Sequence, residues 1–347
     1  MLVPENSALI LWYHYGRRAV VLSEHLNAKT LFVNHLIKSR GIIWKLFFWA
    51  DYAYKGLYTL LFLVYYKPDV VFATSPPAFC PIFCWAYCKV FRKKLIVDAH
   101  NSAFTGRWIS TPFYKNVLQS AFMVIVHNYE YEKYLKKKYP NIRFHTLHDK
   151  IPTFKPVNGK NGKDTDNRKH FLLPISYGYD EPVEQLFEAI ESFLNRENTL
   201  NIGFKITGNY LKRKDLYERY NRVDGIEFLG FVDFNIYDNL LRNAFGVIAL
   251  TTAQMVQQCA VIEAMGASVP VIVTETETNL RLFYRGAVFT KVDVSGIENA
   301  IREFVYKRPE LAEGVEAVRN HWHKRWETDF EKLNRRVGQM PAETVAG

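Results

Sequence analysis

Residues 95–101, LIVDAHN, end an apolar run with two side chains that can move protons, Asp98 and His100. We expect Leu95–Asp98 to form a buried strand, and residues i and i+2 of a strand point to the same side. Both side chains would then lie together at the carboxyl end of a sheet. A partly desolvated carboxylate has a raised pKa and suits general base catalysis. Asp98 is therefore the predicted catalytic base, with His100 as the alternative base.

A second chemical motif, YHYGRRA, follows the expected first strand Ala8–Trp12. Gly16 and Arg17 stand where a helical pattern begins. Backbone N–H groups at such a position, with an arginine beside them, can approach phosphate oxygens. A solvated helix start would have the same sequence, and both interpretations stay open.

The second half of the chain offers a similar arrangement after the expected strand Gly246–Leu250. Amides at the start of the expected helix Gln258–Met265 would bind an anion, because the positive end of the helix dipole lies there. Simple capping of the helix is the alternative. The polar residues between this strand and the helix start are Thr251, Thr252, Gln257 and Gln258. Glu263 lies one turn into the helix, where an ordinary surface glutamate is the alternative to a binding role.

Composition sets the class of protein. With 347 residues and 48% hydrophobic residues, the chain has enough apolar material for two domains, which excludes a disordered protein. Four cysteines give no disulfide framework, so we expect a reducing, cytoplasmic compartment.

The positive charge lies in the first half. Residues 1–150 carry 20 Lys and Arg against 8 Asp and Glu, whereas the remainder carries 25 against 27. A basic half suggests nucleic acid, a phosphorylated ligand or a membrane surface as partner. The apolar stretch Ile42–Tyr66 is interrupted by Lys45, Asp51 and Lys55, so it is not expected to span a bilayer. Its aromatic stripe suits either a core or a membrane face.

Apolar runs alternate with amphipathic segments along the whole chain, which predicts parallel sheets covered on both faces. The polar segment Lys155–Lys169 is the expected linker. We therefore predict an α/β protein with two Rossmann-like, doubly wound domains facing each other across a cleft. The predicted parts are an N-terminal domain at 1–154, a C-terminal domain at 170–310 and terminal helices at 311–347.

Ordered motifs give this pattern a family resemblance. The second half contains PISYGYDEPVEQLFEAI, ITG, VDGIEFLGFV, LLRNAFGVIALTT and QQCAVIEAMGASVPVIVTE, in this order. These resemble the donor-nucleotide domain of GT-B fold glycosyltransferases in the broad family 4, which includes enzymes of bacterial exopolysaccharide and capsule assembly. WYHYGRRA, KPDVVFATSPP and LIVDAHN in the first half resemble the acceptor domain of the same group.

The resemblance implies a role for each group of residues. Glu263 would bind the ribose of a nucleotide sugar, with UDP as the usual carrier, and His14 and Asn101 would contact the acceptor. His100 would be either the base or a contact to the donor sugar. The other residues expected at the nucleotide sugar are Gly16, Arg17, Tyr177, Gly208, Thr251, Thr252, Gln257 and Gln258.

Two departures from the family pattern bear on stereochemistry. Retaining members carry a second Glu eight positions before the ribose-binding one, and that position here is Met255. The basic residue that the family places after the first strand of this domain is absent from Tyr177–Pro182. Both departures favour an inverting enzyme with Asp98 as base. A retaining glycosyltransferase and a sugar-nucleotide epimerase of the same fold remain the alternatives.

The expected function is a hexosyl- or uronosyl-transferase that acts on a lipid-linked glycan in polysaccharide assembly. It would lie at the inner face of the cell membrane, held by an anionic surface. No metal is expected, because the relatives bind the diphosphate through helix ends and cations. Nucleic-acid binding is the non-enzyme alternative, which the slightly acidic second half and the absence of a recognition motif disfavour.

Overall fold

The computed structural model describes residues 6–14, 16–36, 42–154, 168–197 and 199–338, and the side chains of 42–46 lie outside this description. The chain divides into two compact units. The first contains residues 1–150 and 325–347, and the second contains residues 151–324. Most of the expected linker, residues 155–167, lies outside the described residues.

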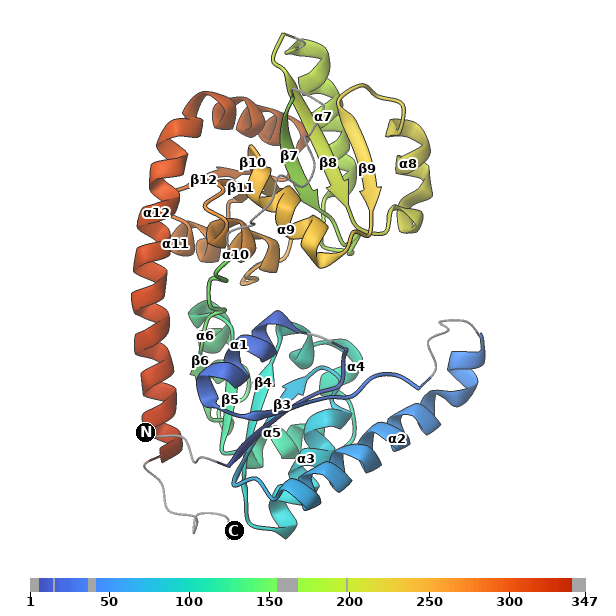
Figure 1. Cartoon of the computed structure of the whole chain (residues 1–347), viewed down its shortest axis with the longest axis vertical. Helices are drawn as coiled ribbons and strands as arrows, with labels where there is room; N and C mark the ends of the chain where they lie inside the picture. Colours follow the sequence, from blue (N-terminus) through green and yellow to red (C-terminus); the bar gives the residue numbers. More distant parts are fainter. Residues whose placement is uncertain (1–5, 15, 37–41, 155–167, 198, 339–347) are drawn as a thin grey trace. The chain divides into compact units, whose positions relative to one another are not determined.

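The first unit is built on a parallel six-stranded sheet with the order β2-β1-β3-β4-β5-β6 (Figure 1). Its strands are β1 (Ser7–Leu11), β2 (Lys29–Phe32), β3 (Val70–Ser75), β4 (Lys94–Ala99), β5 (Met123–Val126) and β6 (Phe144–Thr146). The strands β1, β3 and β5 are buried along their whole length, as parallel strands covered on both faces must be. Strand β2 lies on one side of β1, and β3 to β6 follow on the other side. The strand order therefore reverses between β1 and β3.

Helices connect these strands. They are α1 (Arg17–Leu26), α2 (Ile42–Tyr66), α3 (Phe79–Val90), α4 (Gly106–Ile109), α5 (Tyr114–Ser120) and α6 (Tyr129–Lys138), with a 3-10 turn at Asn101–Phe104. Helix α2 packs directly on α3, and Gly56 permits the close approach, because a Cβ there would lie 2.3 Å from the Phe83 ring. Helix α1 contacts the last helix of the chain through His25 and Trp326.

The second unit holds another parallel six-stranded sheet, with the order β12-β11-β10-β7-β8-β9. Its strands are β7 (Lys169–Pro174), β8 (Ile202–Thr207), β9 (Ile226–Gly230), β10 (Gly246–Ala249), β11 (Val271–Thr274) and β12 (Ala287–Thr290). The helices are α7 (Val183–Arg196), α8 (Lys214–Tyr220), α9 (Phe234–Asn243), α10 (Cys259–Gly266), α11 (Glu277–Leu282) and α12 (Val294–Gly338), with a 3-10 turn at Tyr210–Arg213. The strand order reverses between β7 and β10.

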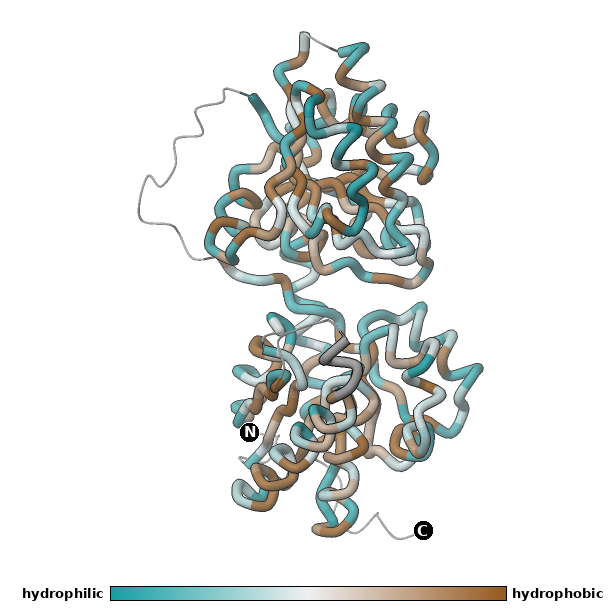
Figure 2. Tube along the Cα trace, turned by 90° about the vertical axis from the view of Figure 1, so that its right-hand side faces the viewer, coloured by the Kyte–Doolittle hydropathy of each residue, from teal (hydrophilic) through white to brown (hydrophobic). Residues whose placement is uncertain are grey.

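Hydrophobic and hydrophilic stretches alternate along the chain in both units, as the colours of Figure 2 show. The core of the second unit contains aromatic rings of β7, β8 and α7. Phe171 stacks on Phe204, and Phe193 meets Phe204 edge to face. The predicted α/β class with two doubly wound, parallel sheets is confirmed, and the expected strands Ala8–Trp12, Leu95–Asp98 and Gly246–Leu250 are present within one residue of their predicted bounds.

The end of the chain differs from the prediction. The sequence pattern predicts a helix at Ile297–Tyr306 and one or two terminal helices at Leu311–Arg335, but α12 is one helix of 45 residues with Pro309 inside it. Its residues up to Lys324 belong to the second unit and those from Arg325 to the first. Pro309 does not end the helix, because buried side chains on both sides of it, Phe304 and Val315, keep the helix packed.

Within the described residues, no helix combines the length and apolar character needed to cross a bilayer.

Candidate functional site

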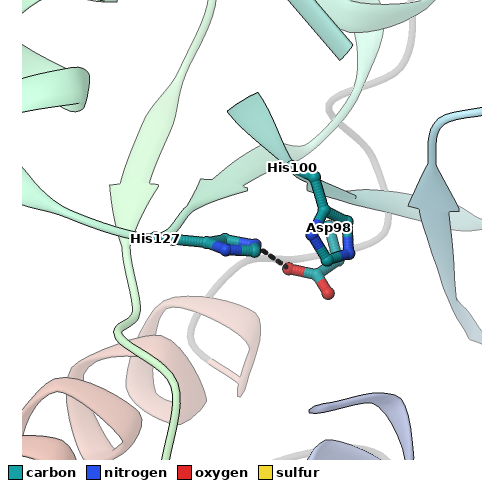
Figure 3. A group of neighbouring side chains, drawn as sticks. All are labelled: Asp98, His100 and His127. Carbon is teal, nitrogen blue, oxygen red and sulfur yellow. Dashed lines mark ion pairs between the residues drawn. The ribbon is translucent and has the colours of Figure 1, made fainter. Parts of the chain in front are cut away.

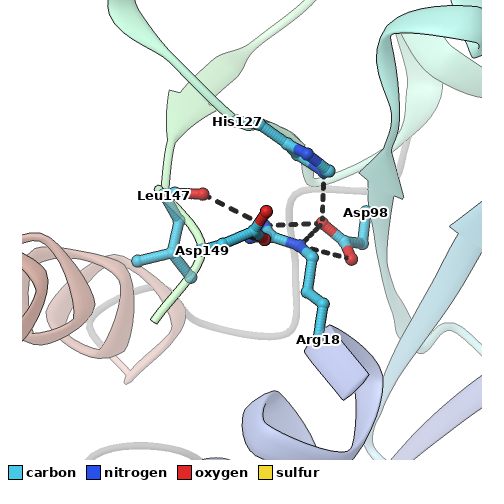
Figure 4. A network of polar contacts seen from close by, with 5 residues as sticks. All are labelled: Arg18, Asp98, His127, Leu147 and Asp149. Carbon is cyan, nitrogen blue, oxygen red and sulfur yellow. Dashed lines mark hydrogen bonds and ion pairs between the residues drawn. The ribbon is translucent and has the colours of Figure 1, made fainter. Parts of the chain in front are cut away.

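Charged residues gather at the carboxyl edge of the first sheet around Arg18, near the start of α1 (Figure 4). Arg18 donates through Nε and Nη2 to the Asp98 carboxylate at 3.1 and 2.9 Å, and through Nη1 to Asp149 at 2.6 Å. It also donates to the carbonyl oxygen of Leu147. Asp98 ends β4, and Asp149 follows β6. One guanidinium thus joins three separate segments at this edge of the sheet.

Asp98 does not have the electrostatics of a general base. Burial alone would raise the pKa of its carboxyl group, but the charge and hydrogen bonds of Arg18 lower it to about 2. The expectation of a raised pKa is therefore wrong. A carboxylate that is 2% exposed and held by a bidentate ion pair is a poor proton acceptor near neutral pH. The geometry gives Asp98 the role of orienting Arg18.

Two imidazoles flank this carboxylate (Figure 3). His100 follows β4 and His127 follows β5. Their rings meet edge to face, with the ring centroids 4.5 Å apart. Burial lowers the pKa of His127 to about 3, with the Arg18 charge acting in the same direction, and burial also lowers the pKa of His100. Both rings are therefore neutral at pH 7. Such rings can exchange hydrogen bonds with sugar hydroxyls.

The same three side chains have the donor types of a metal site. Ligand atoms of Asp98, His100 and His127 lie within 4.8 Å of one another. Arg18, however, holds both carboxylate oxygens. A cation would have to displace the guanidinium, so the donor set fits an ion pair better than a metal.

The other residues predicted in the first unit lie near this edge. Gly16 is the N-cap of α1, and Arg17 is its first residue. His14 is exposed before the helix, and Asn101 opens the 3-10 turn after β4, where its carbonyl oxygen accepts a hydrogen bond from Tyr131. In the GRR motif, the arginine that enters the polar network is Arg18, not the predicted Arg17.

The second unit has a pocket where its strand order reverses, the place where open α/β sheets bind ligands. It is small, with about 10 Å³ of space for a water-sized molecule. The ends of β7 and β10 form its walls, and Glu181 and Gln258 are its polar lining. Gln258 is the N-cap of α10, and among the described residues no side chain caps this helix. The Nε2 group of Gln258 reaches the carbonyl oxygen of Leu250, and its Oε1 atom is buried with no hydrogen-bond partner there.

The loop after β7 is folded around two carboxylates. Glu181 accepts hydrogen bonds from the backbone amides of Ser176 and Gly178, at 3.2 and 3.0 Å. Asp180 accepts one from the Thr251 hydroxyl at 2.8 Å, and its carbonyl oxygen accepts from the amide and hydroxyl of Thr252. The predicted Thr251 and Thr252 therefore brace this loop. The Glu181 carboxylate accepts the hydrogen bonds of two backbone amides just after the end of β7.

Tyr177 and Gly208 lie together at the ends of β7 and β8. The Tyr177 backbone is left-handed, with φ 57°, and its buried hydroxyl has no hydrogen-bond partner among the described residues. Burial raises the pKa of Tyr177 to about 12. Gly208 has φ 113°, and a Cβ there would lie 1.8 Å from the Ile175 carbonyl oxygen. Only glycine lets the two strand ends approach so closely.

Glu263 lies on α10, one turn after the helix start. It is half-buried, and Tyr237 of α9 donates to its Oε2 atom at 3.0 Å. Gln257 is buried just before the helix. Met255, which takes the position of the second family glutamate, has a left-handed backbone with φ 57°.

The sequence does not single out His127, Asp149 or Glu181 as residues of these two sites, and it offers Arg18 only as part of the GRR motif. A signal was present for His127 and Asp149, because each follows a predicted strand just as His100 does. Glu181 was seen only as part of a segment that lacks a basic residue.

Part of the second unit matches a known protein family by sequence. The family described as Glycosyl transferases group 1 matches residues 174–306, which include Tyr177, Gln258 and Glu263. The match covers residues 174–306, all of which lie in the second unit. The resemblance drawn from the sequence is thereby confirmed, and the group 1 region contains the pocket between β7 and β10.

Solved structures show that the whole chain has the GT-B fold. Sucrose-phosphate synthase from Thermosynechococcus elongatus aligns with a TM-score of 0.70 at 13% identity, over 94% of this chain and 98% of that one. Anabaena HepE in complex with UDP and glucose aligns with a TM-score of 0.67 at 12% identity, over 96% and 100%. An α,α-trehalose-phosphate synthase from Burkholderia xenovorans aligns with a TM-score of 0.69 at 11% identity, over 96% and 100%. No curated protein matches the chain by sequence.

Removing Arg18 should destabilise the protein strongly. In Arg18→Leu, Asp98 and Asp149 stay buried without their cation, and breaking a buried pair in this way typically costs about 3–5 kcal/mol. Urea unfolding followed by circular dichroism measures the loss in the free energy of unfolding.

Arg213→Leu is the matched control, because Arg213 also pairs with two carboxylates, Glu184 and Asp215, which are 59% and 61% exposed. Exposed pairs contribute about 0–1 kcal/mol. Equal losses in the two variants would show that burial does not govern the Arg18 network.

The neutral His127 makes stability depend on pH. Its pKa is lowered to about 3 in the folded protein, so as the pH falls below 6.5 the unfolded chain gains a proton that the folded chain does not. The free energy of unfolding should therefore fall between pH 6.5 and pH 3, by at most about 1.4 kcal/mol per pH unit from this group. His127→Gln should flatten this slope in urea titrations, whereas His14→Gln, at an exposed position, should not. An unchanged slope in His127→Gln would contradict the neutral state.

Proposed function

We propose that the chain is a retaining glycosyltransferase that moves a hexosyl residue from a UDP-sugar to a lipid-linked saccharide in polysaccharide assembly. The observation that carries the proposal is the group 1 match over residues 174–306. The matched region holds the pocket at the reversal of strand order and the uncapped start of α10 beside it.

The donor diphosphate is proposed to bind at the ends of β7 and β10. Amides there offer hydrogen bonds, and the start of α10 offers the positive end of a helix dipole. Lys212 supplies a cation nearby, because its Nζ atom donates to the Ser176 carbonyl oxygen at 2.7 Å. Glu181 occupies two of the amides and would have to leave them when the diphosphate binds.

Glu263 is proposed to accept hydrogen bonds from the ribose hydroxyls. The Tyr237 hydroxyl fixes the carboxylate one turn inside α10, which suits a ligand whose phosphates lie at the start of that helix. UDP is proposed as the carrier because structures of HepE contain UDP and UDP-glucose. HepE shares only the fold with this chain, so the nucleotide is a proposal to be tested.

The inverting mechanism expected from Met255 and Asp98 is not supported, because the group 1 family favours the retaining alternative. In a front-face displacement, the acceptor oxygen bonds to the anomeric carbon on the side from which the diphosphate leaves. The bond between carbon and diphosphate breaks, and a departing phosphate oxygen takes the acceptor proton. Such a transfer needs no protein carboxylate as base, which fits an Asp98 that Arg18 keeps ionised and occupied.

His100 is proposed to contact a sugar hydroxyl through its neutral ring, and His14 and Asn101 are proposed acceptor contacts. The acceptor is proposed to be an anionic lipid-linked saccharide, because residues 1–150 carry the excess of positive charge.

Two glutamates of the group 1 region should respond oppositely to the same substitution. Glu263→Gln should weaken UDP binding by about ten- to a hundred-fold, because it removes a charged acceptor worth about 1.5–3 kcal/mol. Glu181→Gln should tighten UDP binding by about three- to ten-fold, because it removes a negative charge from beside the diphosphate. Isothermal titration with UDP measures both changes.

Glu184→Gln is the control, because Glu184 lies three residues after Glu181 in the first turn of α7, and its side chain is 59% exposed and paired with Arg213. It should bind UDP as the native protein does. Weaker binding by Glu181→Gln would mean that this carboxylate holds the loop in its binding form. Unchanged binding by Glu263→Gln would remove Glu263 from the donor site.

The stereochemistry can be tested without knowing the acceptor. Slow hydrolysis of UDP-glucose by the enzyme should release α-glucose first, because water then enters on the face that the diphosphate leaves. Proton NMR of the anomeric signals, recorded before mutarotation, follows this release. Initial β-glucose would establish inversion, and a change of configuration within the nucleotide sugar would indicate an epimerase.

A further inference from the structure

Helix α2 exposes apolar side chains and buries its charged ones, which is the reverse of an ordinary surface helix. Every exposed residue from 47 to 66 is Ala, Val, Leu, Phe, Tyr or Trp. The only charged residues in this stretch, Asp51 and Lys55, are both 1% exposed. We call the exposed side the outer face of α2. Its large side chains are Phe47, Trp49, Tyr54, Leu57, Tyr58, Leu61, Val64 and Tyr65.

A polar network fixes this orientation of the helix. Asp51 accepts hydrogen bonds from the Leu36 amide at 2.8 Å and faces the His35 ring nitrogen at 2.7 Å. Lys55 lies 3.2 Å from the same carboxylate, and its ammonium group is near the rings of Trp12 and Tyr52. A rotation that buried the outer face would expose this network and break it.

The apolar surface continues onto α3 and ends in basic residues. The two helices run in the same direction, because Trp49 contacts Phe79 near their starts and the Tyr87 hydroxyl reaches the Pro68 carbonyl oxygen near their ends. Figure 1 shows α2 on the outside of the first unit, beside α3. At the shared end lie the exposed apolar residues Val90 and Phe91, with the exposed cations Lys67, Lys89 and Arg92.

We propose that the outer face of α2 docks the protein on an anionic lipid bilayer, with the helix lying in the plane of the interface. The described part of the face is about 30 Å long, at the α-helical rise of about 1.5 Å per residue. Aromatic and aliphatic side chains on one side of a helix suit the boundary between headgroups and acyl chains, and flanking cations suit anionic headgroups. The proposal names the partner of the first unit and concerns a surface apart from the donor site.

Charge favours a bilayer over a second copy of the chain. Residues 1–150 carry 20 positive against 8 negative side chains, so two copies joined by this face would bring two basic units together. An anionic bilayer instead complements both the apolar face and the basic end. The sequence leaves open whether the aromatic stripe of this helix faces a core or a membrane. The exposed apolar side of α2 adds insertion of apolar side chains to the electrostatic attraction expected from the basic charge.

The test is sedimentation of the full chain with vesicles of phosphatidylglycerol and phosphatidylcholine. Leu57 and Leu61 are 60% and 59% exposed, so glutamates there should leave the fold intact. The double variant Leu57→Glu, Leu61→Glu should lower the vesicle partition coefficient by about a hundred-fold or more, since a buried leucine side chain contributes at least about a factor of ten. The control variant Tyr284→Glu, Tyr306→Glu adds the same charges at exposed positions of the second unit and should bind vesicles nearly as the native chain does.

Native vesicle binding by the double variant would overturn the proposal. So would a native dimer that Leu57→Glu, Leu61→Glu converts to monomer in analytical ultracentrifugation while vesicle binding persists, because a second copy would then cover the face. Titration with UDP separates this proposal from the proposed function. Loss of vesicle binding with native UDP affinity supports the docking face whether or not the chain transfers a sugar.

Discussion

The ion pairs of Arg18 are the interaction on which the first unit depends most. A single guanidinium satisfies the carboxylates of Asp98 and Asp149 and so joins α1, the end of β4 and the segment after β6. Buried charges of this kind stabilise a fold only when each has its partner. Arg18 also affects the chemistry of its neighbours, because its charge and hydrogen bonds keep Asp98 ionised, and its charge adds to the burial that keeps His127 neutral. An edge that looks like an acid–base site in the sequence is therefore a rigid hydrogen-bonding surface.

The second unit uses the opposite arrangement at the corresponding edge of its sheet. There the carboxylates of Asp180 and Glu181 satisfy backbone amides and a threonine hydroxyl, and Lys212 donates to the carbonyl oxygen of Ser176. In the proposed function, an incoming diphosphate competes with the Glu181 carboxylate for these amides. Binding and rearrangement of the loop after β7 would then be one event, which gives this loop control over donor affinity without a basic residue in the family position.

The fold could be predicted from the sequence because each strand is a short apolar run between turn residues, and such runs have few alternatives. The error at α12 lies in the separation of Ile297–Tyr306 from Leu311–Arg335, whereas buried residues on both sides of Pro309 maintain one helix. Arg17 was chosen over Arg18 by its position next to glycine. Helical spacing favours Arg18, which lies four residues before the buried Leu22 and therefore on the same face. The pKa of Asp98 could not be predicted, because it depends on a partner 80 residues away.

Helix α2 shows why hydropathy alone could not assign its role. Charged residues at 51 and 55 interrupt the apolar stretch, which correctly argued against a membrane-spanning helix but left open which side faces the core. The structure answers this, since both charges point inward and are paired. Burying a pair is costly, and leaving a row of aromatic and aliphatic side chains in water costs more. Helix α2 has both unfavourable features, and the exposure of its outer face is relieved only when that face is covered. The proposed bilayer covers it without a protein partner.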